Sequence, residues 1–181
     1  MNIYNQNDEF VKFNVDFLNG YLTSIALLRD YVTTEVGFNF YFKKIGHNKS
    51  LTEAINDEIK WVLDRYIGID EVNELNSAPS RIVEIMNWQA ELVMLLNFWI
   101  GEGLTKAIKE ENRKWNHSYD LILKDFIEYL KLFFQGQEVK VYVFNEEFKT
   151  ILPRQWGWLK CDDIIFATSN ETYLLHFDLS D

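Results

Sequence analysis

The chain has 181 residues, of which 48% are hydrophobic and 16% aromatic, and its formal net charge is −10. This length and composition predict a single folded domain, residues 1–181, with a sizeable apolar core, and they exclude an intrinsically disordered chain. The acidic balance argues against direct binding of nucleic acid, because a nucleic-acid binder needs a basic face.

Cysteine usage and the N-terminus indicate the compartment. The single Cys161 excludes an internal disulfide, and we expect no cysteine-based zinc site. A lone cysteine suits a reducing environment, and the N-terminal residues carry acids where a secretory leader needs a basic start. We therefore expect a cytoplasmic protein with no membrane association, no cofactor and no metal ion.

The first third of the chain carries helical patterns. Apolar residues recur at helical spacing from Asp8 to Tyr31, and Asn19-Gly20 either divides this run into two helices or marks a point of close packing. The segment 31–42 is β-branched and aromatic, which is compatible with a strand or with one more helical turn. Ser50 and Glu53 form a capping box that predicts a helix up to about residue 66.

The most apolar stretch runs from Ser80 to Gly101. It predicts a central helix enclosed by other elements, with a thin polar stripe of Glu84, Asn87 and Glu91 on one face. The stretch is shorter than a membrane span requires. Two further helices are predicted at 104–115 and 119–134.

The pattern changes to a period of two after Gly136, which indicates β-strands. A turn at Ser169–Glu171 separates two apolar runs and predicts a hairpin. The predicted strands lie at 139–144, 148–152, 156–159, 164–168 and 172–179. The predicted fold class is α+β: residues 1–136 mainly form a helical bundle around the central apolar helix, and residues 137–181 form a small antiparallel sheet packed on it.

His176 and Asp178 are the clearest candidates for chemistry. Two residues apart on a strand, they share a face, and such a pair orients a catalytic imidazole or begins a metal site. No third ligand has a recognisable spacing, so a structural histidine is the preferred interpretation. The neighbours Asp162 and Asp163 should point to opposite faces and form no carboxylate dyad. We predict no catalytic residues from any known motif.

Two segments are candidate binding surfaces. The segment from Glu53 to Glu74 contains seven acidic residues and only two basic ones. This balance is typical of a solvated surface or of a surface complementary to a basic partner. Downstream, two tryptophans and an arginine form either an interface hot spot or part of the core. The candidate partner-binding residues are Asp57, Glu58, Asp64, Asp70, Glu71, Glu74, Arg154, Trp156 and Trp158.

In its acidity, its size, its use of Asn, Lys and Ile, and its closing segment DDIIFATSNETYLLHFDLSD, the chain resembles the immunity proteins of bacterial toxin systems, including contact-dependent inhibition. The resemblance carries no motif residue with it. It implies a cytoplasmic, non-enzymatic inhibitor that occludes a basic toxin domain, often a nuclease. Two alternatives remain: a metal-dependent or hydrolytic enzyme using His176 and Asp178, and a subunit of a homo-oligomer.

Overall fold

The computed structural model describes residues 13–32, 37–66, 82–102, 116–144 and 158–180. In these ranges the chain forms four α-helices, one π-helix and five strands. Their bounds are α1 Val15–Val32, β1 Gly37–His47, α2 Leu51–Tyr66, β2 Ile82–Ile85, α4 Trp88–Leu96, η3 Asn97–Glu102, α6 Asn116–Phe133, β3 Lys140–Phe144, β4 Trp158–Ala167 and β5 Glu171–Ser180. No described helix is long and apolar enough to cross a membrane.

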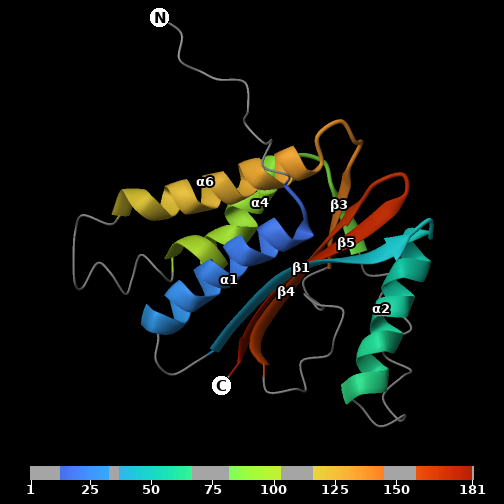
Figure 1. Ribbon diagram of the computed structural model, residues 1–181, viewed down its shortest axis with the longest axis horizontal. Helices are drawn as coiled ribbons and strands as arrows, with labels where there is room; N and C mark the ends of the chain where they lie inside the picture. Colours follow the sequence, from blue (N-terminus) through green and yellow to red (C-terminus); the bar gives the residue numbers. More distant parts are fainter. Residues whose placement is uncertain (1–12, 33–36, 67–81, 103–115, 145–157, 181) are drawn as a thin grey trace, which may run out of the picture.

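The strands form one antiparallel sheet in the order β1-β5-β4-β3-β2, and helices lie on both of its faces (Figure 1). Helices α1, α4 and α6 cover one face and enclose the larger core, in which Phe42, Trp99 and Phe126 are fully buried. Helix α2 lies on the other face and encloses a smaller core with Ile55 and Ile59. The α+β class is confirmed, because alternating strand residues supply an apolar side to each helical layer.

Three helices follow from local patterns in the sequence. The capping box of α2 is present, since the Glu53 amide donates to Ser50 Oγ and the Ser50 amide donates to Glu53 Oε2. Helix α6 matches the helix predicted at 119–134. Helix α1 runs through Gly20 without a break, and a Cβ at Gly20 would meet nothing within 4 Å, so neither interpretation of this glycine holds.

The central helix predicted from Ser80 to Gly101 is wrong in its first part. Residues Ile82–Ile85 form strand β2, which pairs with β3 in the register Ile82↔Phe144 to Ile85↔Val141. Helix α4 begins only at Trp88, and its outer side exposes Val93, Met94 and Leu95. A short segment rich in β-branched residues gains backbone hydrogen bonds when it pairs with a neighbouring strand. This gain outweighs the preference for a helix that the spacing of its apolar residues indicates. The expectation that this helix is enclosed on nearly all sides is therefore also wrong.

The two strands of the C-terminal hairpin are confirmed, and β4 joins most of the run predicted at 164–168 to the described part of the run predicted at 156–159. The sheet also takes two strands from the N-terminal part of the chain. One is β1, for which the sequence left a strand and a helical turn open, and the other is β2. The predicted helix at 104–115 and strand at 148–152 lie outside the described residues.

The outer edge of β1 is covered by two polar side chains of α1. Asn19 donates from Nδ2 to the carbonyl oxygen of Phe42 at 2.8 Å, and its Oδ1 accepts the amide of the same residue at 2.7 Å. Nearer the end of the helix, Asp30 Oδ1 accepts the amide of Phe38 at 2.8 Å. These side chains stand in for a neighbouring strand, so the edge offers fewer open backbone groups to another chain.

We expect Asn19→Asp to lower the free energy of unfolding by about 2 kcal/mol, because a carboxylate accepts the Phe42 amide but cannot donate to its carbonyl oxygen. Urea denaturation followed by circular dichroism measures this. Ser24→Ala, which removes an exposed hydroxyl bonded to Gly20 of the same helix, is the control and should cost less than about 0.5 kcal/mol. Equal costs for the two variants would show that water replaces the amide at this edge.

Candidate functional site: a buried histidine between two carboxylates

Four polar side chains meet on the face of the sheet that carries α2. In the register of β4 and β5, Asp163 lies opposite His176 and Cys161 lies opposite Asp178. Because every second residue of a strand points to the same face, both residues of each strand project to this side. All four are at least nine-tenths buried.

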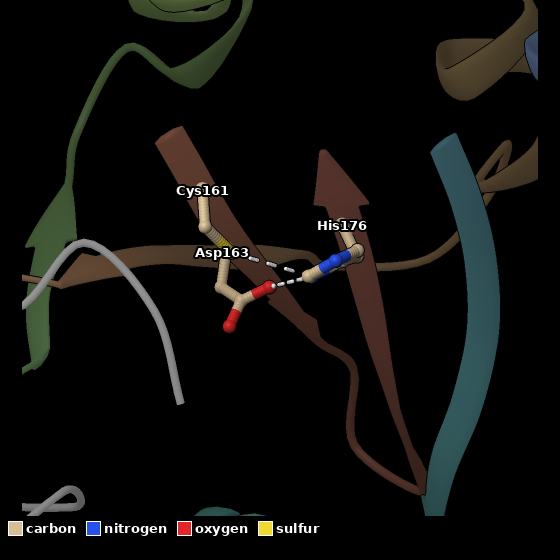
Figure 2. Close-up of side chains that lie close together, drawn as sticks. All are labelled: Cys161, Asp163 and His176. Carbon is tan, nitrogen blue, oxygen red and sulfur yellow. Dashed lines mark hydrogen bonds and ion pairs between the residues drawn. The ribbon is translucent and has the colours of Figure 1, made fainter. Parts of the chain in front are cut away.

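The imidazole of His176 lies between two carboxylates. Its Nδ1 is 2.6 Å from Asp163 Oδ1, and its Nε2 is 2.9 Å from Asp178 Oδ2. The sulfur of Cys161 lies 3.9 Å from the same Nδ1. Figure 2 shows the carboxylate of Asp163 and the thiol of Cys161, both from β4, directed toward the ring on β5. The His176–Asp178 pair predicted from sequence is thus in contact, and Asp163 and Cys161 join it.

This geometry favours the charged form of the histidine. A neutral imidazole has one N–H, so its second nitrogen would present a lone pair to a carboxylate oxygen. Burial works against the charge, but the charge of Asp163 and the hydrogen bonds that His176 donates to Asp163, Asp178 and Cys161 outweigh it, and the pKa of His176 is raised well above its usual value. The cluster therefore holds a buried imidazolium with two carboxylate neighbours.

Two side chains of strand β1, which pairs with β5, also contact the cluster. Asn39 Nδ2 donates to Asp178 Oδ2 at 2.8 Å, which fixes that carboxylate. The ring of Tyr41 stacks on the imidazole with centroids 4.6 Å apart and planes 22° from parallel. Burial raises the pKa of the Tyr41 hydroxyl. The ring is therefore neutral and offers its π-face to the imidazolium, a favourable cation–π contact.

The arrangement limits what chemistry His176 performs as drawn. A general base needs a ring nitrogen within reach of a substrate, but both nitrogens of this 2%-exposed residue face carboxylates. Thiol, carboxylate and imidazole are instead the donor types that bind a transition metal. Within the described residues, Cys161, Asp163 and His176 are a set whose ligand atoms all lie within 4.8 Å of one another.

The two neighbouring acids of β4 point to opposite faces, as predicted. Asp163 joins His176, whereas Asp162 accepts a hydrogen bond from Trp99 Nε1 at 2.6 Å on the side of α4 and η3. Strand alternation therefore gives each carboxylate a different buried partner. The expectation that they form no dyad with each other is confirmed.

The candidate partner-binding residues are placed in part. Asp57 is exposed on α2 and forms an ion pair with Lys49 at 2.5 Å. Glu58 is buried and forms an ion pair with Lys43, so it faces the protein interior. The side chains of Asp64 and Trp158, and the whole of Asp70, Glu71, Glu74, Arg154 and Trp156, lie outside the described residues.

The structure adds Trp61 to this surface. The sequence places this residue among the apolar positions of the helix, but its side chain is 44% exposed one turn after Asp57. Lys43 Nζ lies 4.2 Å from the centroid of the indole ring and also binds Glu58. We call Asp57 and Trp61 the α2 surface. It combines an aromatic side chain held in place by a lysine with an exposed carboxylate.

No family model matches the chain, and no curated protein matches it. Among solved structures, it is similar to citrus MAF1 in two crystal forms. One has 11% sequence identity and a TM-score of 0.45, covering 88% of this chain and 98% of that one. The other has 13% identity and a TM-score of 0.45, covering 93% and 100%. Likeness of this degree assigns neither a family nor a function.

Proposed function

We propose that the chain is an acidic binding protein that neutralises a basic protein partner, as the immunity proteins of bacterial toxin systems do, and that it acts by covering the partner's working surface. The α2 surface is the observation that carries this proposal. Its exposed residues Trp61 and Asp57 lie within the segment Glu53–Glu74, which contains seven acidic residues and two basic ones.

A tryptophan beside a charged group is a frequent composition of an interface hot spot. Here the cation of Lys43 restrains the indole ring, and Glu58 restrains that lysine in turn. A side chain that is ordered before binding loses less conformational entropy when the partner arrives. The excess of acids in the sequence from Glu53 to Glu74 would accelerate the encounter with a basic domain.

The enzyme alternative receives less support from the geometry. An enzyme of this kind requires His176 to contact a substrate. Both ring nitrogens of His176 instead contact carboxylates, on a buried face of the sheet. The acids at 70–74 and the segment with Arg154, Trp156 and Trp158 remain further parts of the proposed binding surface. A cytoplasmic location belongs to the same proposal.

The test uses the protein encoded by the reading frame immediately upstream as the probe. Expressed in a bacterial host, that protein should arrest growth, and co-expression of this chain should restore it. The purified pair should form a complex whose association rate falls as salt rises. No protection, or no complex, would contradict the proposed function.

The α2 surface is tested with two variants of this chain. Trp61→Ala should weaken the complex by at least about 10-fold, and Asp57→Lys should slow association most strongly at low salt. Glu128→Lys on α6 is the matched control, because Glu128 is similarly exposed and also pairs with one lysine, Lys131. It should change affinity less than about twofold. If protection persists unchanged in all three variants, inhibition uses another face.

A further inference from the structure

Three side chains with three different ligand atoms converge between β4 and β5. Cys161 and Asp163 share one face of β4, and His176 projects from β5 opposite Asp163 (Figure 2). Their ligand atoms lie within 4.8 Å of one another, and all three residues are buried. Thiolate, carboxylate and imidazole nitrogen together suit a borderline divalent ion such as Zn²⁺ better than Mg²⁺ or Ca²⁺, which prefer oxygen alone.

The fourth polar residue orients the imidazole. Asp178 Oδ2 lies 2.9 Å from His176 Nε2 and also accepts a hydrogen bond from Asn39. A histidine that binds a metal usually donates its other ring N–H to a partner such as a carboxylate, and donation of Nε2–H to Asp178 leaves Nδ1 as the ligand atom. Nδ1 is the atom that faces Asp163 and Cys161 here. The stacked ring of Tyr41 restricts rotation of the imidazole out of this plane.

The ligand atoms all lie within 4.8 Å of one another, so limited movements bring them to the separations that a tetrahedral ion needs. Bonds of about 2.0–2.3 Å to N, O and S place the ligand atoms roughly 3.3–3.8 Å apart. The 3.9 Å between Cys161 Sγ and His176 Nδ1 is near this range. The 2.6 Å between Nδ1 and Asp163 Oδ1 is a hydrogen bond that must open by roughly 0.7 Å, which is within reach of a rotation of the carboxyl group.

We propose that Cys161, Asp163 and His176 form a binding site for a borderline divalent transition metal, with zinc as the fitting ion and Asp178 as the carboxylate that orients His176. Three protein ligands leave one position for a non-protein ligand such as water. The ion links β4 to β5 across the middle of the sheet. This inference is independent of the partner of the α2 surface.

Cobalt titration of the full-length, chelator-treated protein tests the site. One Co²⁺ per chain should bind and produce the near-ultraviolet thiolate-to-cobalt band together with the visible bands of tetrahedral cobalt, and Zn²⁺ should displace it. Cys161→Ser should abolish the thiolate band and weaken binding by more than about 10-fold. Asp178→Asn should keep the band and weaken binding by about 10- to 100-fold.

His47 provides the control. His47 is exposed, and its Nδ1 lies 3.6 Å from Glu171 Oε1. A histidine and a carboxylate paired in this way on the surface bind zinc weakly. His47→Gln should leave cobalt binding unchanged. Circular dichroism should show that each variant is folded, and Cys161→Ser exchanges atoms of similar size at the site. The proposal is overturned if the folded wild-type chain gives no thiolate band with stoichiometric Co²⁺, or if Cys161→Ser binds cobalt as the wild type does.

Discussion

Asp163→Ala should lower the free energy of unfolding of the metal-free protein by about 3–5 kcal/mol, the range for removing one partner of a buried ion pair. Asp163 is 3% exposed and His176 is 2% exposed, so water cannot replace the lost carboxylate without opening the sheet. The variant takes from His176 Nδ1 its acceptor at 2.6 Å and also the negative charge that most favours the protonated ring. Denaturant unfolding in the presence of a chelator measures the change.

A surface carboxylate provides the control for this variant. Glu128→Ala removes the partner of Lys131 on α6 and should cost less than about 1 kcal/mol, because exposed ion pairs contribute little. Asp163→Asn keeps a carbonyl oxygen as an acceptor but loses the charge, so its cost should fall between the two. A cost below about 1 kcal/mol for Asp163→Ala would mean that His176 is neutral in the folded chain.

Trp99→Ala should lower the free energy of unfolding by a similar amount, about 3–5 kcal/mol. Trp99 lies in the π-helix η3 and is fully buried, and its ring contacts Phe40 and Phe177 with centroids 5.8 and 5.6 Å apart. Its Nε1 donates to Asp162. Truncation leaves a large cavity between η3 and the sheet and removes the donor from a carboxylate on β4.

A second tryptophan provides a matched control. Trp61→Ala removes the same side chain from a site that is 44% exposed, and it should cost less than about 1.5 kcal/mol. Trp99→Phe keeps an aromatic ring but removes the N–H, and its cost should lie between those of the two alanine variants. Thermal and denaturant unfolding provide the comparison. Equal costs for Trp99→Ala and Trp61→Ala would contradict the assignment of Trp99 to the centre of the larger core.

Elements with local causes were predictable. The capping box of α2 needs only Ser50 and Glu53 three residues apart, and it forms as predicted. Helix α6 and strand β3 follow from periods of 3.6 and 2 in the sequence. The hairpin between β4 and β5 follows from its turn, which the amide of Thr168 closes by donating to the carbonyl oxygen of Glu171. In each case the contacts that matter lie within a few residues.

Strands β1 and β2 depend on partners far along the chain. Strand β1 pairs with β5, about 135 residues later, and α1 covers its other edge through Asn19. Strand β2 has only four residues and pairs with β3. In a segment rich in β-branched and aromatic residues, helical spacing and strand pairing compete, and the distant partner decides. The sequence alone therefore favoured a helix where β2 forms.

Some features of the candidate site were also predictable from the sequence, and others depend on the pairing of strands. Strand alternation alone placed His176 and Asp178 on one face and Asp162 and Asp163 on opposite faces, and both predictions are confirmed. That Cys161 and Asp163 meet His176 is a matter of register between two strands. Counting outward from the predicted turn at 169–171 would pair position 164 with 176, which is one residue away from the observed register of 163 with 176 and 161 with 178.

The sequence by itself determined the α+β class, helices α2 and α6, the hairpin and the direction of side chains along each strand, because these depend on neighbours in the chain. Only the tertiary structure decided which strands share the sheet and which side chains are buried together. It also decided that Glu58 faces inward while Trp61 is exposed. Burial and register are set by which surfaces pack, and packing joins residues that no local pattern relates.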